Sequence, residues 1–120
     1  MAVEFKERRR FPRYPCDTGV RIHPEKGTAG YWGTLSDISA GGCYVYTFSP
    51  LSVGELITVV IKANDVEINM AGKIVSSHPG VGMGIAFQGF LQADGESRLK
   101  TYLAHLASQP KAKESIAVFH

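Results

Sequence analysis

From residue 17 to residue 88 the chain has the pattern of short β-strands. β-branched and aromatic residues come in runs, and glycine, proline, asparagine and aspartate separate one run from the next. Asn64-Asp65 and His78-Pro79-Gly80 are predicted to form the turns around the fifth strand. The predicted strands are Gly19–His23, Tyr31–Ser36, Gly42–Phe48, Leu56–Ala63, Glu67–Ser77 and Gly82–Gln88. Because closure removes exposed strand edges, this all-β pattern favours a six-stranded antiparallel β-barrel, closed or nearly closed.

After the last strand the pattern becomes helical. Apolar residues recur at i, i+3, i+4 and i+7, which is the spacing of one helix face: Leu99, Tyr102, Leu103 and Leu106. The spacing predicts one C-terminal α-helix over about residues 94–108, with Asp94 as its N-cap and Pro110 ending it. A single apolar stripe must be covered, so we expect the helix to pack on the barrel. Residues 109–120 lack periodicity and are predicted to form a flexible tail.

Size and composition indicate one domain with its own core. The chain has 120 residues, of which 44% are hydrophobic and 20% charged, and a domain of this size folds without a metal or a disulfide. Cys16 and Cys43 have neither metal-ligand spacing nor the density of a secreted scaffold, and the four histidines are scattered. No apolar leader or membrane-spanning stretch is present, so we expect a cytoplasmic protein without membrane insertion.

The N-terminal segment concentrates positive charge. Residues 4–13 hold five cations and two carboxylates, and Pro12 and Pro15 favour an extended backbone. We therefore divide the chain into a flexible basic arm (1–14), the barrel with its helix (15–108) and the tail (109–120). Arg9 and Arg13 form an Arg-x-x-x-Arg segment, and guanidinium groups pair with phosphate in a bidentate fork, stack on rings and bond the O6/N7 edge of guanine. The alternative is a basic arm that is only solvated.

A second polar group is predicted where the second strand meets the third. In Asp37-Ile38-Ser39-Ala40-Gly41-Gly42, Asp37 and Ser39 alternate with Ile38, so they are expected on one face while Ile38 points inward. The paired glycines would permit φ > 0 and a close approach of the backbone to a ligand. An ionised carboxylate could accept from the N–H groups of a guanine edge, and a hydroxyl could do either. The alternative is an ordinary Asx or Ser turn.

Together the two motifs resemble those of the PilZ family, which combines Arg-x-x-x-Arg with Asp/Asn-x-Ser-x-x-Gly. The resemblance covers roughly residues 7–107, including the strand Gly82–Phe87 and the helix that follows. It implies a six-stranded barrel with a C-terminal helix and a non-catalytic receptor that binds cyclic di-GMP on its outer face. The implied ligand-binding residues are Arg9, Arg13, Asp37, Ser39 and Gly42, and Arg8, Arg10 and Gly41 are neighbouring candidates.

The resemblance implies no cofactor and no catalytic residue. The implied output is a downstream protein partner in motility, pili, exopolysaccharide or virulence control. Whether the chain is a monomer or a dimer stays open. From the charge of the arm we expect it to order when a dianionic ligand binds.

Three other functions are alternatives to a receptor for cyclic di-GMP. A nucleic-acid-binding barrel would use the arm on phosphates and Phe11, Tyr14 or Trp32 on bases, but the net charge is only +2 and the strands hold few cations. A protein-interaction adaptor of the same fold that binds no nucleotide is the main alternative. An enzyme is disfavoured because no base, nucleophile or metal-binding group occurs at a recognisable spacing.

For the side chain of Trp32, we expect packing in the core or at the barrel rim.

Overall fold

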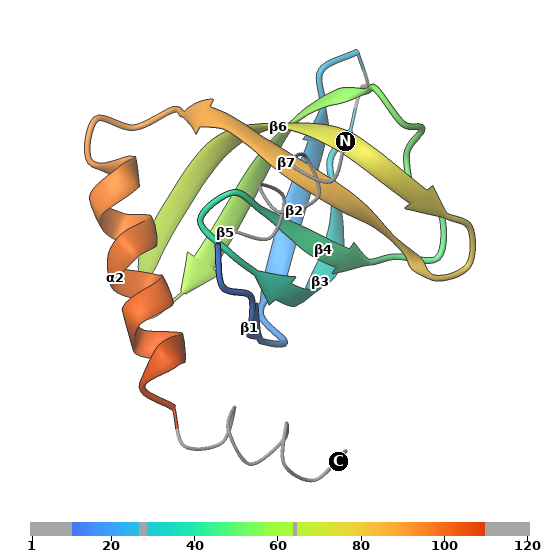
Figure 1. The fold of residues 1–120 in the computed structure, drawn as a ribbon. Coiled ribbons are helices and arrows are strands. Elements are labelled where there is room, and N and C mark those ends of the chain that lie inside the picture. The colour runs from blue at the N-terminus through green and yellow to red at the C-terminus, as the bar shows by residue number, and fades with distance from the viewer. Residues whose placement is uncertain (1–10, 27–28, 64, 110–120) are drawn as a thin grey trace, which may run out of the picture.

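Alternating apolar residues in the strands build a closed barrel, with one helix against its side (Figure 1). The computed structural model describes residues 11–26, 29–63 and 65–109. The sheet order is β1-β3-β2-β5-β6-β7-β4, all neighbouring strands are antiparallel, and a further pairing of β3 with β4 closes the barrel. The strands are β1 (Tyr14–Pro15), β2 (Gly19–Pro24), β3 (Tyr31–Ile38), β4 (Gly42–Tyr46), β5 (Leu56–Ala63), β6 (Val66–His78) and β7 (Gly82–Phe90).

The core fills the inside of the barrel. In β2 and β5 every second residue points inward, as the period of a strand requires, so Val20, Ile22, Val59 and Ile61 are fully buried. The remaining strands contribute Leu35, Ile38, Val45, Ile68, Met70, Ile74 and Met83, all without solvent exposure. Within the described ranges, no helix is long and apolar enough to cross a membrane.

All six predicted strands are confirmed, with ends that differ by three residues or fewer. The predicted turns are also confirmed where they are described, because Asp65 has φ 66° and Gly80 has φ 79°. Strand β1 was not predicted. This strand has only two residues, Tyr14 and Pro15, which pair with Ile38 and Asp37 of β3.

Three register shifts interrupt the alternation of the strands: one between β6 and β7 at Ala71 and Gly72, and two β-bulges nearer the candidate site. In β3 the register with β4 slips between Leu35 and Asp37. Leu35 and Ile38 are both fully buried, so Asp37 lies on the outer face, whereas strict alternation from Leu35 would have turned it inward. A second slip, at Val75 of β6, lies opposite β7. As described below, both bulges border the candidate site.

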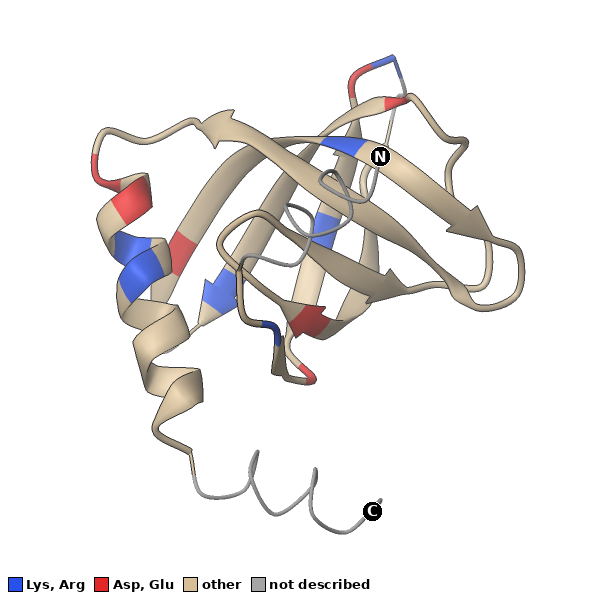
Figure 2. Cartoon of the chain, in the orientation of Figure 1, with Lys and Arg blue, Asp and Glu red and all other residues tan. Residues whose placement is uncertain are grey.

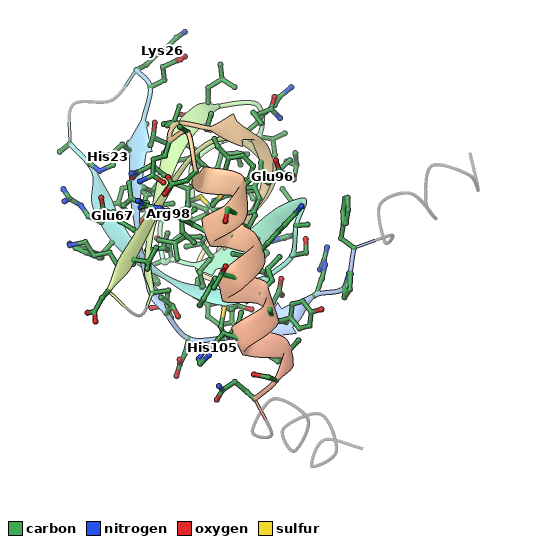
Figure 3. All side chains as sticks on the ribbon, turned by 90° about the vertical axis from the view of Figure 1, so that its left-hand side faces the viewer. His23, Lys26, Glu67, Glu96, Arg98 and His105 are labelled. Carbon is green, nitrogen blue, oxygen red and sulfur yellow. The ribbon has the colours of Figure 1, made fainter. Side chains whose placement is uncertain are left out.

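Helix α2 (Gly95–Ala107) covers the barrel beside β6 and β1 (Figure 3). Its predicted stripe is confirmed, because Leu99, Tyr102 and Leu106 are buried and Leu103 packs against the core. The N-cap position at Asp94 is also correct, but the capping role is wrong. The Asp94 side chain makes no capping hydrogen bond and instead accepts one from Arg98.

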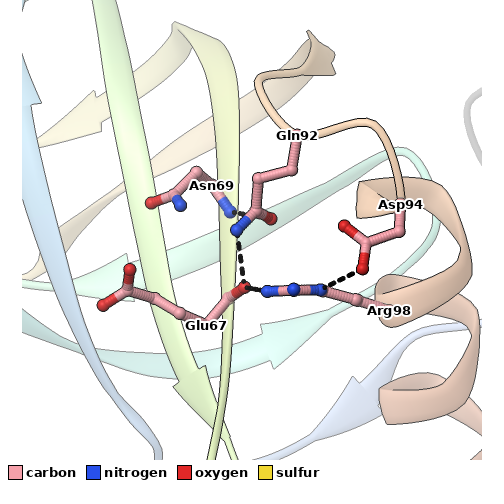
Figure 4. A network of polar contacts seen from close by, with 5 residues as sticks. All are labelled: Glu67, Asn69, Gln92, Asp94 and Arg98. Carbon is pink, nitrogen blue, oxygen red and sulfur yellow. Dashed lines mark hydrogen bonds and ion pairs between the residues drawn. The ribbon is translucent and has the colours of Figure 1, made fainter.

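Arg98 joins the start of α2 to β6 (Figure 4). Its Nε donates to Asp94 Oδ2 at 2.8 Å, and its Nη1 donates to the Glu67 backbone carbonyl at 2.6 Å. Gln92 bonds the same carbonyl through Nε2 at 3.1 Å, and its Oε1 accepts from the Asn69 backbone N–H at 3.1 Å. These bonds to the backbone of β6 fix the helix start independently of any β6 side chain.

The middle of the helix is joined to the segment that follows β1. The hydroxyls of Tyr102 and Thr18 share a hydrogen bond of 2.7 Å. Cys16 lies in the same contact, half-buried and as a free thiol. Burial is the main cause that raises the pKa of Tyr102 to about 12; Cys16 adds to the rise, and the bond to Thr18 opposes it. The N-terminal segment and α2 are therefore packed together.

The expected packing of Trp32 is wrong. This side chain is 60% exposed on the outer face of β3, and the guanidinium carbon of Arg21 lies 5.4 Å from the centre of its ring. Arg21 is its cross-strand neighbour on β2, so the two side chains cover one another outside the barrel by a cation–π contact.

Candidate functional site

A hollow of about 490 Å³ lies on the outer face of the barrel, over β3, β4, β6 and β7. Its volume falls within the range of small-molecule sites. It brings together residues that are far apart in the sequence. The lining residues are Phe11, Arg13, Asp37, Ser39, Gly41, Gly42, Cys43, Tyr44, Val75, Ser76, Gly84, Ile85 and Ala86.

Both predicted motifs contribute to this hollow. Arg13 comes from the segment just before β1, and Asp37 lies near the end of β3. The pairing of β1 with β3 accounts for this meeting, because Pro15 is directly opposite Asp37. Arg13 is exposed, and none of the ion pairs between described residues involves Arg13 or Asp37. A cation and a carboxylate thus face the same open volume.

Ser39 shapes the junction between β3 and β4. It is only 8% exposed, and its Oγ accepts from the backbone N–H groups of Gly41 at 3.1 Å and Gly42 at 3.2 Å. The Ser39 N–H also donates to the Gly42 carbonyl at 2.8 Å. The Ser turn that the sequence left open is therefore present. A bond from Ser39 to a base edge stays a prediction.

The glycines permit close packing rather than φ > 0. Among the described glycines only Gly54 and Gly80 have positive φ, so that expectation for Gly41 and Gly42 is wrong. A Cβ on Gly42 would overlap the carbonyl oxygen of Ile85 on β7, and one on Gly41 would lie 3.0 Å from the Phe11 ring. Gly42 therefore lets β4 and β7 approach, and Gly41 makes room for Phe11.

A row of cross-strand neighbours crosses the hollow from β3 to β6. Asp37 is paired with Tyr44, Tyr44 with Gly84, and Gly84 with Ser76. The Ser76 Oγ accepts from the Gly84 N–H at 3.1 Å. Both Val75 and Ser76 line the hollow because the bulge at Val75 interrupts the alternation of β6.

Burial and the charge of Asp37 raise the pKa of two side chains at the row, Tyr44 and Cys43. Slight burial, then the neighbouring Tyr46 and the charge of Asp37, raise the pKa of the Tyr44 hydroxyl, so Tyr44 is neutral at physiological pH. Below the row, complete burial is the main cause that raises the pKa of the Cys43 thiol far above its usual value. Cys43 is therefore a packed, protonated side chain beneath the site.

Eight lining residues were not predicted: Phe11, Cys43, Tyr44, Val75, Ser76, Gly84, Ile85 and Ala86. One of them had a readable signal, because Tyr44 follows Gly42 by two positions and so shares its face. Phe11 lies between Arg9 and Arg13 in the sequence. Val75 and Ser76 arrive from a strand more than thirty residues later, and only the barrel topology brings them to Asp37.

Three candidate residues, Arg8, Arg9 and Arg10, lie outside the described residues. Within the described ranges, no group of three or more His, Cys, Asp or Glu residues could hold a metal ion. Charged residues on the described strands are few and scattered, as Figure 2 shows, and several lie on α2. No continuous basic track crosses the described part of the barrel.

Comparisons with known proteins identify the fold. A family model described as PilZ domain matches residues 7–105. A search of curated proteins found no match. The structure of the K. pneumonia MrkH–c-di-GMP complex aligns with 24% identity and a TM-score of 0.72 over 88% of this chain and 54% of that chain. The chain thus spans about half the length of MrkH.

Two separate domains of known structure align over nearly their whole length. The PilZ domain of YcgR from Escherichia coli, solved with c-di-GMP, has 16% identity and a TM-score of 0.67 over 90% of this chain and 98% of that domain. The PilZ domain of CeSA from a cellulose-synthesising bacterium has 24% identity and a TM-score of 0.62 over 78% of this chain and 99% of that domain. At these identities the likeness establishes the fold.

Proposed function

Because this chain belongs to the PilZ domain family, we propose that it is a receptor for cyclic di-GMP and binds this dinucleotide in the outer hollow. One observation carries the proposal: Arg13, Asp37, Ser39 and Gly42, from two separate motifs, line the same hollow. The MrkH and YcgR structures of the same fold, which are described as c-di-GMP complexes, support the choice of ligand.

The proposed chemistry follows from the residue types. Arg13 would grip a phosphate or the O6/N7 edge of a guanine, with Arg9 supplying a second guanidinium. Asp37 would accept hydrogen bonds from the N1 and N2 groups of the base. Ser39 would hold the turn, and to bond the base edge its hydroxyl would exchange its 3.3 Å bond to the Gly42 carbonyl for one to the ligand. Gly42 would keep β4 close to β7. Arg8, Arg10 and Gly41 are secondary candidates, and no residue is assigned to catalysis.

Calorimetric titration tests the proposal. Cyclic di-GMP is titrated into the full chain beside GTP and cyclic di-AMP. Protein at about 50 μM, roughly ten times a Kd in the micromolar range, makes binding visible. We expect saturable heat with cyclic di-GMP and much weaker heat with the other two. No heat with cyclic di-GMP would reject the receptor and leave the adaptor of the same fold.

Two variants assign the binding to the hollow. Each charge-assisted hydrogen bond contributes about 1.5–3 kcal/mol, so Arg13→Ala should weaken binding about tenfold to a few hundredfold, and Asp37→Ala should have a similar effect. Arg21→Ala is the matched control, because it also removes one cation but lies on β2 outside the hollow. Equal losses in Arg13→Ala and Arg21→Ala would indicate only a general effect of charge.

We further propose that the ligand orders the basic arm and that the changed surface is read by a partner protein. The arm concentrates like charges, and a dianionic ligand would offset their repulsion. Trypsin tests this step, since it cleaves after lysine and arginine. Saturating cyclic di-GMP should protect the arm from cleavage in the wild type but not in Asp37→Ala. Equal cleavage with and without ligand would exclude the step. The cytoplasmic location of the chain and the identity of its partner remain predictions.

A further inference from the structure

The hollow contains an aromatic side chain that neither motif includes. Tyr44 lies two residues after Gly42 on β4 and occupies the centre of the cross-strand row. Its neighbour on one side is Asp37, and its neighbour on the other is Gly84, which has no side chain. Strands β3, β4 and β7 lie side by side here (Figure 1). Tyr44 therefore projects from the floor of the hollow beside the carboxylate.

The ring of Tyr44 is held in one position. Its hydroxyl shares a hydrogen bond of 2.9 Å with Nδ1 of His78. Its Cε2 would be 2.7 Å from a Cβ on Gly82, so the ring rests over that glycine. The edge of Tyr46 meets it with ring centroids 6.0 Å apart and planes at 79°. A ring fixed in this way loses little further conformational freedom when a ligand binds.

The exposure of the ring suits a planar partner. Tyr44 is only half-buried although it lines the hollow, and the glycines at positions 82 and 84 place no side chain over it. An aromatic ring with a free surface beside a carboxylate can contact the plane of a base while the carboxylate bonds the base edge. In a row of paired residues, the Cβ atoms of Asp37 and Tyr44 lie about 5 Å apart.

We propose that Tyr44 is a stacking platform for the guanine base that Asp37 bonds, and that His78 and Gly82 position its ring. The inference rests on the proposed function, because it assigns a subsite within the same hollow. Stacking tolerates any base, so Tyr44 supplies affinity, and the hydrogen bonds of Asp37 select guanine.

Calorimetric titration with cyclic di-GMP tests the subsite. Stacking on one base corresponds to a change of about 5- to 150-fold in Kd, so Tyr44→Ala should weaken binding by that factor. Tyr44→Phe keeps the ring and loses only the bond to His78, so its Kd should stay within about threefold of wild type. Trp32→Ala is the control, since Trp32 is an exposed aromatic side chain on the outer face of β3 that does not line the hollow. Thermal unfolding of each variant establishes that it is folded. If Tyr44→Ala is not folded, Tyr44→Leu replaces it.

A double-mutant cycle tests whether the two residues share a base. If Tyr44 and Asp37 act on the same guanine, the loss in Tyr44→Ala/Asp37→Ala should be clearly smaller than the product of the two single losses. A Kd for Tyr44→Ala within twofold of wild type, an equal loss in Trp32→Ala, or strictly multiplicative losses would overturn the subsite. Those results leave the receptor intact, whereas a wild-type chain that does not bind cyclic di-GMP would reject the receptor itself.

Discussion

The close approach of β4 and β7 at Gly42 predicts a specific loss of stability. In Gly42→Ala the new methyl group would meet the carbonyl oxygen of Ile85, with the Ile85 carbonyl carbon at 3.3 Å and the Ala86 Cα at 3.4 Å. All three atoms belong to the backbone, so no side-chain rotation relieves the contact, and the two strands must separate. Overpacking of this kind costs about 1–3 kcal/mol, and the lower entropy of an unfolded alanine chain returns about 0.5–1 kcal/mol. We expect a net loss of about 1–2 kcal/mol.

Thermal and urea unfolding measure this loss. For a domain of about 100 residues, a loss of 1–2 kcal/mol lowers Tm by roughly 5–15 °C. Gly89→Ala is the control, because a Cβ there has no atom within 4 Å. Gly41→Ala is a second comparison, since its methyl would meet only the Phe11 ring. A Gly42→Ala variant as stable as Gly89→Ala would refute the reasoning, and would make that glycine a requirement of the ligand alone.

Three further predictions follow from the described contacts. Ser39→Ala removes the hydroxyl that accepts from the part-buried N–H groups of Gly41 and Gly42. Urea unfolding should therefore show a loss of about 1–3 kcal/mol, and an unchanged midpoint would mean that water replaces the hydroxyl. Arg98→Ala removes the bonds to Asp94 and the β6 backbone and should lower the free energy of unfolding by about 1 kcal/mol. Lys100→Ala breaks only an exposed ion pair and should lower it by less than about 0.5 kcal/mol. Equal losses of stability in the two variants would contradict the role of Arg98 in docking the helix. Stability should fall in alkali, because burial raises the pKa of the Cys43 thiol. Above about pH 9 the thiol loses its proton in the unfolded chain but keeps it in the folded chain. This difference lowers the free energy of unfolding by up to about 1.4 kcal/mol per pH unit. Urea midpoints at pH 8, 9 and 10 measure the decline, and Cys43→Ala should be less steep over that range; equal slopes would exclude the thiol as the cause.

The sequence predicted the barrel well because strand periodicity is a local property. Runs such as Leu56–Ala63 carry their alternation within themselves, and β5 has those bounds in the structure. The helix was predicted for the same reason. β1 could not be found in this way, because two residues have no readable period and their partners in β3 lie more than twenty positions later.

The candidate site was predicted in part. Arg13, Asp37, Ser39 and Gly42 were expected together and line one hollow. The outward position of Asp37 depends on the bulge in β3, and the sequence shows that only indirectly, as two buried residues, Leu35 and Ile38, three positions apart. The roles of Ser39 and Gly42 as turn and packing residues could not be predicted, because they depend on the path of neighbouring backbone.

The short strand β1 decides how the arm can be studied. Tyr14 and Pro15 pair with Ile38 and Asp37, and the Cys16 N–H donates to the Ser36 carbonyl at 3.1 Å. A chain shortened past residue 16 would therefore lose the four arginines of the arm and also uncover hydrogen-bonding groups along the end of β3. Bare strand edges recruit other chains, so such a truncation should self-associate, and its failure to bind a nucleotide would say little about the arginines.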